Sequence, residues 1–124
     1  MKQVLATEQA PAAIGPYSQG IAAGETVYVS GQLPLDPATG AFPEGIAAQT
    51  AQSLKNIQAI LAQQGMTLAN VVKTTMFLAD INDFAEMNKV YGEFFTQPYP
   101  ARSAVQVAKL PKDAPLEIEC IAVK

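Results

Sequence analysis

Two stretches of the chain carry apolar residues at the spacing of an amphipathic helix. In Ile46–Gln64 they recur every three to four positions, and Gly65 follows where a helix often ends on glycine. The second stretch begins near Asp83, which with Glu86 three residues later is typical of a capping box, and it ends before Pro98. Its apolar residues predict one core-facing stripe and are Phe84, Met87, Tyr91, Phe94 and Phe95.

The remaining apolar segments are short and often β-branched, which predicts strands. Two of them are separated by a turn at Ala23–Glu25, which predicts a hairpin. Proline and glycine gather in Ala10–Pro16 and Leu33–Glu44, so we expect loops there. The predicted strands are Lys2–Ala6, Tyr17–Ala22, Thr26–Ser30, Val71–Leu78, Arg102–Ala108 and Leu116–Val123.

This order of elements predicts an α+β domain over residues 1–124, in which two helices can cover only one face of the sheet. The last strand is nevertheless apolar on both faces, with Leu116 and Ile118 on one and Ile121 and Val123 on the other. A sheet that is apolar on both faces is normally covered on both. We therefore predict an oligomer, with a site at the seam between subunits.

The composition excludes several kinds of chemistry. The chain has no histidine and one cysteine, so an intrachain disulfide, the usual zinc sites and a Ser-His-Asp or Cys-His catalytic unit are excluded. Cys120 lies in an apolar strand, and we interpret it as a buried thiol. The net charge is −3 and the lysines are scattered, which indicates no nucleic-acid surface.

Targeting signals are also missing from the pattern. No apolar run approaches the roughly 20 residues of a membrane-spanning helix. The N-terminus reaches polar residues at Thr7 to Gln9, too early for a secretory leader. We expect a cytoplasmic protein that does not contact a membrane.

Arg102 is the only arginine, and it begins a strand of small or apolar residues. A guanidinium in such a strand needs an anionic partner, and its fork of donors matches a carboxylate. Two interpretations stay open. Arg102 binds the carboxylate of a ligand, or it forms a structural ion pair with Glu117 or Glu119.

Glu117 and Glu119 lie two residues apart on the last strand, so they face the same way, beside Ile121 and Val123. Apolar neighbours raise the pKa of a carboxyl group by desolvation, which suits a general acid or base near neutral pH. The alternative is that one or both carboxylates are solvated at the edge of the strand.

Two hydroxyl groups lie next to backbone positions of restricted or special geometry. Tyr17 follows Gly15–Pro16, and Ser30 precedes Gly31, which permits close approach of the backbone. Either hydroxyl could orient a ligand or a water molecule. The alternatives are a packed aromatic ring and a turn serine.

A series of motifs in fixed order covers nearly the whole chain. They are Ala10–Gly20, Val29–Pro34, Gln49–Ile57, Val72–Thr75, Asp80–Phe84, Pro100–Ser103, Leu110–Asp113 and Ile118–Val123. Together they resemble the RidA (YjgF) family. The resemblance implies a chorismate-mutase-like fold, in which a mixed six-stranded sheet carries two helices on one face. It also implies a homotrimer with a central barrel and clefts between subunits.

The activity that the resemblance implies is the hydrolysis of reactive 2-imino acids to 2-oxo acids and ammonia. The substrates would be 2-iminobutanoate, 2-iminopropanoate and enamine tautomers such as 2-aminoacrylate, which pyridoxal-phosphate-dependent dehydratases release. Such a deaminase detoxifies metabolites and uses neither a cofactor nor a metal.

The resemblance also assigns roles to single residues. Arg102 matches the arginine that holds the substrate carboxylate, and Glu117 matches the glutamate that positions the attacking water. Tyr17 and Ser30 match residues that line the site, and Gly31 matches a small residue that leaves room for the ligand.

Two further positions need comment. Many members of the family have a cysteine where this chain has Ala104. Its backbone N–H can still reach a carboxylate, so we expect substrate binding to survive. Asn88 matches an asparagine that is common in the family, and we interpret it as structural.

Other functions stay open at this point. The chain could be a non-catalytic chaperone or a regulatory protein that binds 2-oxo acids. It could be an endoribonuclease or translation inhibitor, which the absence of basic clusters disfavours. It could also be a deaminase for another enamine, with rim residues such as Tyr99 setting the preference.

Overall fold

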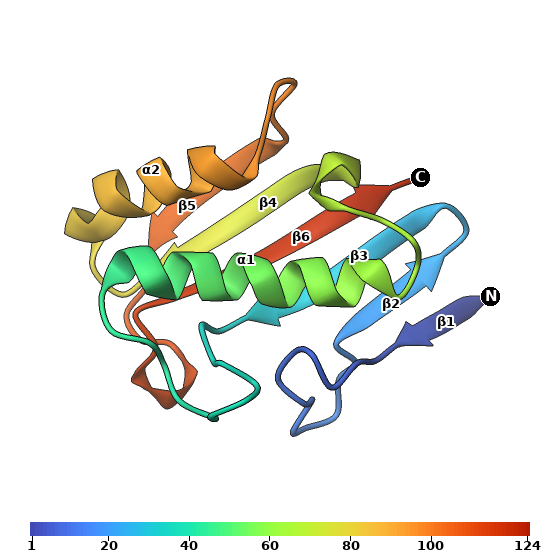
Figure 1. Ribbon diagram of the computed structural model, residues 1–124, viewed down its shortest axis with the longest axis horizontal. Helices are drawn as coiled ribbons and strands as arrows, with labels where there is room; N and C mark the ends of the chain where they lie inside the picture. The colour runs from blue at the N-terminus through green and yellow to red at the C-terminus, as the bar shows by residue number, and fades with distance from the viewer.

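The computed structural model describes residues 1–124 and places both α-helices on one face of a six-stranded sheet (Figure 1). The helices are α1 (Ile46–Ala62) and α2 (Phe84–Phe94). The strands are β1 (Lys2–Leu5), β2 (Gly20–Ala23), β3 (Thr26–Gln32), β4 (Val71–Leu78), β5 (Ala101–Gln106) and β6 (Leu116–Val123).

The sheet is mixed, as expected. Its strand order is β1-β2-β3-β6-β4-β5, and only the β4–β5 pair is parallel. Parallel neighbours need a crossover, and α2 supplies it between β4 and β5. The last strand in sequence, β6, therefore lies in the middle of the sheet, while β5 with Arg102 forms one edge.

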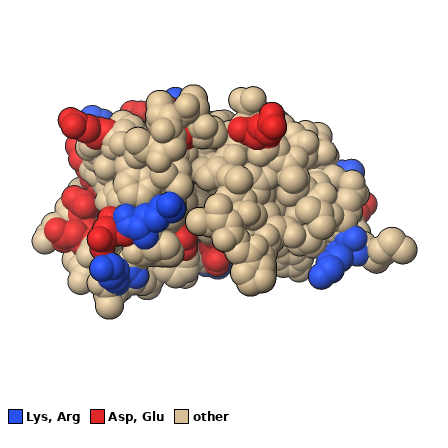
Figure 2. All heavy atoms as spheres, turned by 90° about the horizontal axis from the view of Figure 1, so that it is seen from below, with Lys and Arg blue, Asp and Glu red and all other residues tan.

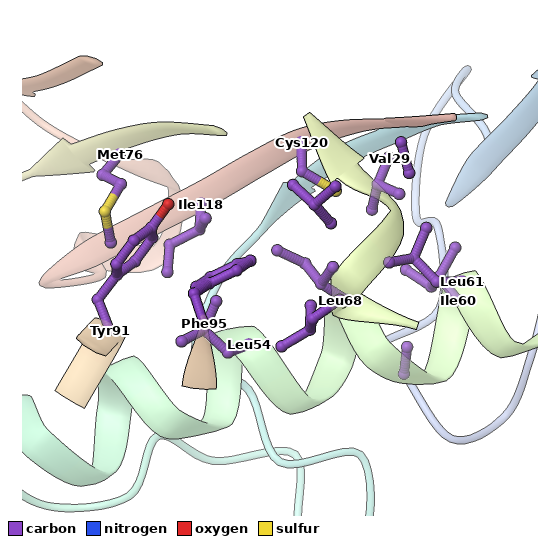
Figure 3. Packing of buried hydrophobic residues seen from close by; sticks show 14 of the residues in the cluster. Val29, Leu54, Ile60, Leu61, Leu68, Met76, Tyr91, Phe95, Ile118 and Cys120 are labelled. Atoms are coloured by element: carbon purple, nitrogen blue, oxygen red, sulfur yellow. The ribbon is translucent and has the colours of Figure 1, made fainter. Parts of the chain in front are cut away.

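The face of the sheet under the helices forms the core. Helix α1 packs across β3 and β6, and α2 lies beside α1 over the β4–β5 end of the sheet (Figure 1). Burial of each large apolar side chain contributes about 1.5–3 kcal/mol. Figure 3 shows Leu54, Ile60 and Leu61 of α1 on one side of this core and Val29, Ile118 and Cys120 of the sheet on the other.

The opposite face of the sheet has no cover within the chain. Along β6, burial alternates with the two-residue period of a strand, so Glu117 and Ile121 remain half-buried on this face. Tyr28 on β3 and Val105 on β5 are 51% and 44% exposed. The prediction that β6 has apolar residues on both faces is therefore confirmed.

Local signals located the ends of α1 well. Gly65 has a φ of 69°, and the N–H of Met66 donates to the carbonyl of Leu61 while that of Gly65 donates to Ala62. This is the hydrogen-bond pattern of a Schellman motif. The predicted glycine terminus is confirmed, although the helix itself ends at Ala62.

The predicted capping box at the start of α2 is wrong. Asp83 is already close to helical, with φ −82° and ψ −3°, and its side chain caps nothing. Asp80 caps instead: its carboxylate accepts the N–H of Asn82 and starts a short 3-10 turn, Ile81–Asp83, that runs into α2. The cap lies one turn earlier because this 3-10 turn precedes the α-helix.

Tyr17 lies in a loop rather than at the start of a strand, because β2 begins three residues later at Gly20. The buried amide of Gln19 fixes this loop. It donates to the carbonyls of Thr7, Ala10 and Pro11 and accepts the N–H of Thr7.

No helix of this fold has both the length and the apolar character needed to cross a membrane.

Candidate functional site

Arg102 lies on the helix side of the edge strand β5. It is in register with Thr74 of β4, and its side chain extends from the sheet to contact residues of α2. Nη1 donates to Oδ1 of Asn88 at 2.6 Å, and Cζ lies 4.8 Å from the ring centroid of Tyr91 and 5.4 Å from that of Phe84. The guanidinium is therefore held by an amide and two aromatic faces.

An open cavity of about 450 Å³ lies beside this guanidinium. It is lined by Asn88, Tyr91, Gly92, Tyr99, Pro100 and Arg102. Arginine has five N–H donors, and one of them is used by Asn88. The remaining donors are available to a planar anion such as a carboxylate.

The alternative of a structural ion pair is wrong for this chain. Its single ion pair joins Lys109 and Asp113 on the surface. Strand β4 separates β5 from β6, and Glu117 and Glu119 extend from the face of the sheet that is opposite Arg102. No carboxylate of the same chain neutralises the guanidinium.

Glu117 lies on the uncovered face and is half-buried. Burial raises the pKa of its carboxyl group, and repulsion from Glu119 raises it further. Gly31 lies directly against it: a Cβ atom at Gly31 would come within 2.5 Å of the Glu117 carboxyl carbon. The room that glycine leaves here is occupied by Glu117.

Tyr17 and Gly31 line one small cavity, of about 50 Å³, together with Ile14 and Lys112. Ser30 lies in a neighbouring hollow of about 290 Å³ beside Tyr28 and Glu119. Its hydroxyl donates to the carbonyl of Ser18 at 2.6 Å, so it ties β3 to the loop that follows Tyr17.

The predicted site residues thus form two groups in one chain. Arg102 and Ala104 belong to the helix side of β5, where half-buried Ala104 packs against the core. Tyr17, Gly31 and Glu117 lie around the other face. Glu117 is in register with Phe77 of β4, three residues along that strand from the partner of Arg102, which is roughly 10 Å. One small acid cannot contact both groups within a single chain.

The sequence pattern did not assign three residues to the guanidinium, namely Phe84, Asn88 and Tyr91, and Phe84 was expected only in the core stripe. We interpreted Asn88 as structural, yet it is exposed, lines the cavity and accepts the Arg102 hydrogen bond. We interpreted Tyr91 as part of the core stripe, which is confirmed by its 5% exposure, but its ring also faces Arg102. Their spacing of three residues, which places both on one helix face, was the available signal.

The chain offers neither a cluster of metal ligands nor a reactive thiol. No three His, Cys, Asp or Glu side chains lie together in a way that could hold a metal ion. Cys120 is a buried free thiol, as predicted, and burial raises its pKa to about 12. It therefore stays protonated at neutral pH and is a poor nucleophile.

Comparison with known proteins identifies the family. The family model described as endoribonuclease L-PSP matches residues 7–124. The chain belongs to this family, which is the RidA/YjgF family. A relative from Salmonella typhimurium, named 2-iminobutanoate/2-iminopropanoate deaminase, is 53% identical over all of this chain and 99% of its own length. A RutC family protein from Pyrococcus horikoshii is 54% identical over 100% and 99% of the two chains.

Solved RidA-family structures share the fold. The crystal structure of Escherichia coli TdcF with bound serine superposes with a TM-score of 0.94 at 47% identity, and covers 98% of both chains. The RidA resemblance and the α+β arrangement of a mixed sheet with two helices are therefore confirmed.

Proposed function

We propose that this protein hydrolyses 2-imino acids, among them 2-iminobutanoate and 2-iminopropanoate, and their enamine tautomers, to 2-oxo acids and ammonia. The observation that carries the proposal is the Arg102 guanidinium, which lies in an open cavity with no carboxylate partner of its own. Full-length relatives at about half identity that are named 2-iminobutanoate/2-iminopropanoate deaminase support the same activity.

The substrate offers the anion that Arg102 lacks. A 2-imino acid carries a carboxylate next to the reacting carbon C2, and a guanidinium binds a carboxylate through two parallel hydrogen bonds. Binding of this kind fixes the position of C2 and therefore the point at which water must attack. Positioning then supplies much of the rate, because a protonated imine is already electrophilic.

Glu117 supplies the base. Its raised pKa keeps it a better proton acceptor than an exposed glutamate. A water held by Glu117 loses a proton to the carboxylate as its oxygen bonds to C2, which gives a carbinolamine. Glu117 returns the proton to the nitrogen, the C–N bond breaks, and ammonia leaves as the C2 oxygen loses its proton and becomes the carbonyl. No cofactor takes part.

We further propose that two chains build each site. Arg102 and Glu117 lie on opposite faces of one sheet, and the face that carries Glu117 is uncovered. A homotrimer of the chorismate-mutase-like type would bury these faces in a central barrel. It would place Arg102 and Ala104 of one domain opposite Tyr17, Ser30, Gly31 and Glu117 of the next.

The test of the function is hydrolysis of 2-iminobutanoate, generated in the cuvette from threonine by a dehydratase. We expect faster release of 2-oxobutanoate and ammonia with the protein than without it. Arg102→Ala should lower kcat/KM by roughly 30-fold or more, since truncating one partner of a hydrogen-bonded charge pair costs about 2–5 kcal/mol. Lys109→Ala, which removes an exposed cation that does not line the cavity, is the matched control. Full turnover in Arg102→Ala would refute the site.

A role in RNA cleavage or in translation is disfavoured by the charge distribution. The net charge is −3, and Figure 2 shows basic side chains that lie apart or beside acidic ones on the face in view. Binding of RNA relies on clustered positive charge and weakens steeply with salt. A purely regulatory or chaperone function predicts no release of ammonia from 2-iminobutanoate, even if the protein binds 2-oxo acids. The hydrolysis assay therefore distinguishes such a function from a deaminase.

We also propose that the protein acts in the cytoplasm, where dehydratases would generate its substrates. Its single cysteine is a buried free thiol, so the fold needs no disulfide and no oxidising compartment.

A further inference from the structure

Tyr91 lies against the Arg102 guanidinium, and the reaction proposed above gives it no part. Its ring centroid is 4.8 Å from Cζ of Arg102, within the range of a cation–π contact. Figure 3 shows the ring directed from α2 toward the sheet, beside Met76, with its oxygen toward the strands. The ring therefore spans from α2 to β4, the strand beside the one that carries Arg102.

The ring is fixed at its far end. The Tyr91 hydroxyl hydrogen-bonds to Oγ1 of Thr74 at 2.8 Å, and Thr74 is fully buried. Thr74 is also the β4 residue in register with Arg102. The Phe95 ring, whose centroid is 4.4 Å from that of Tyr91, packs against it from the residue that follows the end of α2. These contacts connect the ring to the strand pair from which Arg102 extends.

This support does not neutralise the cation. A carboxylate beside Arg102 would occupy its N–H donors and compete with a ligand. An aromatic face attracts the guanidinium through its quadrupole and leaves the N–H groups free. Asn88 takes a single donor at one nitrogen, and its neutral amide brings no opposing charge. Burial also raises the pKa of Tyr91, so the ring remains a neutral phenol beside the cation.

We propose that Tyr91, held in place by Thr74, is a positioning residue that holds the Arg102 guanidinium ready for the substrate carboxylate. The inference rests on the carboxylate-binding role of Arg102 proposed above. An arginine side chain that is already ordered loses less conformational freedom when the ligand binds, so the platform strengthens binding without contacting the ligand.

The experiment measures the dissociation constant for 2-oxobutanoate by calorimetry, together with KM and kcat for 2-iminobutanoate. Tyr91→Leu should weaken 2-oxobutanoate binding and raise KM by about tenfold, the loss expected for a partly desolvated cation–π contact. The change in kcat should stay within about twofold, because Arg102 still grips the carboxylate in the bound complex and holds C2 in the same place once the ligand is there.

Two variants separate positioning from general damage to the core. Tyr91→Phe keeps the aromatic face and loses the Thr74 bond, so its affinity should fall only about threefold. Phe94→Leu makes the same aromatic-to-leucine change in the same helix at a half-buried side chain and should bind 2-oxobutanoate as the wild type does. If Tyr91→Leu does not fold, as judged by circular dichroism, Tyr91→Met takes its place with the same expectation.

Equal losses in Tyr91→Leu and Phe94→Leu would overturn the proposal, as would wild-type affinity in Tyr91→Leu. In an Arg102→Ala background, Tyr91→Leu should have no further effect, because the two residues act together. An additional tenfold loss there would also contradict it. If the wild type binds 2-oxobutanoate but releases no ammonia, the proposed function fails while the affinities still judge Tyr91. If the wild type neither binds a 2-oxo acid nor releases ammonia, both fail.

Discussion

Single residues in this protein derive their chemistry from which face of the sheet they occupy. Glu117 and Ile118 are neighbours in sequence, yet Ile118 is fully buried under the helices while Glu117 stands half-buried on the other face. This intermediate burial raises the carboxyl pKa without removing the group from solvent. The environment suits a base that must exchange protons with water.

The pH dependence of the reaction should report Glu117. The base must be ionised, so kcat/KM should rise with pH through an apparent pKa above the ordinary glutamate value of about 4.3. Glu119→Gln removes the repulsion that is the second cause of the shift, and should move this rise to lower pH. Glu117→Gln should lower kcat by roughly 100-fold or more and abolish the rise. An unchanged profile in Glu117→Gln would assign the base elsewhere.

At the residue scale, the sequence identified candidate site residues only where a residue type is rare or unexpected in its surroundings. Arg102 attracts notice because it is the only arginine, and Glu117 because it interrupts an apolar strand. Thr74 and Tyr91 could not be distinguished from ordinary core residues, because their hydroxyl contact joins positions 17 residues apart. Such a pairing depends on how α2 settles on the sheet, which no local pattern encodes.

At the scale of elements, helix ends depend on particular backbone angles. Gly65 adopts a φ of 69° after α1, whereas Gly92 lies inside α2 without a positive φ, and a Cβ there would meet no atom within 4 Å. A left-handed backbone penalises any residue with a side chain, while a glycine within a helix is less favourable than alanine.

The same substitution should therefore have opposite effects at these two positions. Gly65→Ala should lower the free energy of unfolding by about 1–2 kcal/mol, and Gly92→Ala should raise it by up to about 1 kcal/mol. Thermal unfolding at one fixed protein concentration checks both, since concentration alters the apparent stability of an oligomer. Destabilisation in both variants to the same degree would mean that backbone angle is not the cause.

At the scale of the whole molecule, the sheet has one face covered by helices and one left open. The open face carries Tyr28 and Val105 as exposed apolar groups and holds Glu117 away from Arg102. The proposed site, which uses both residues, would then be completed by a neighbouring chain, and a closed ring of identical subunits would complete every site in the same way.

Mixing of two inactive variants tests this arrangement. Arg102→Ala and Glu117→Gln should each be inactive alone, while trimers reassembled from an equal mixture should regain activity at roughly a quarter of their sites. Those sites combine an intact arginine from one chain with an intact glutamate from the next. Sedimentation of each variant as a trimer is the control. A mixture that stays inactive, although subunits exchange, would show that each site belongs to one chain.

The sequence by itself determined the elements of this protein, because helix period, strand alternation and turn residues act over a few neighbouring positions. It also supplied the hypothesis of a carboxylate ligand, from a lone guanidinium and a carboxylate among apolar residues. The tertiary structure decided which residues meet. The placement of β6 between β3 and β4 separates Glu117 from Arg102, and the crossover through α2 brings Asn88 and Tyr91 to the guanidinium. Such contacts arise from long-range strand pairing, which local patterns do not specify.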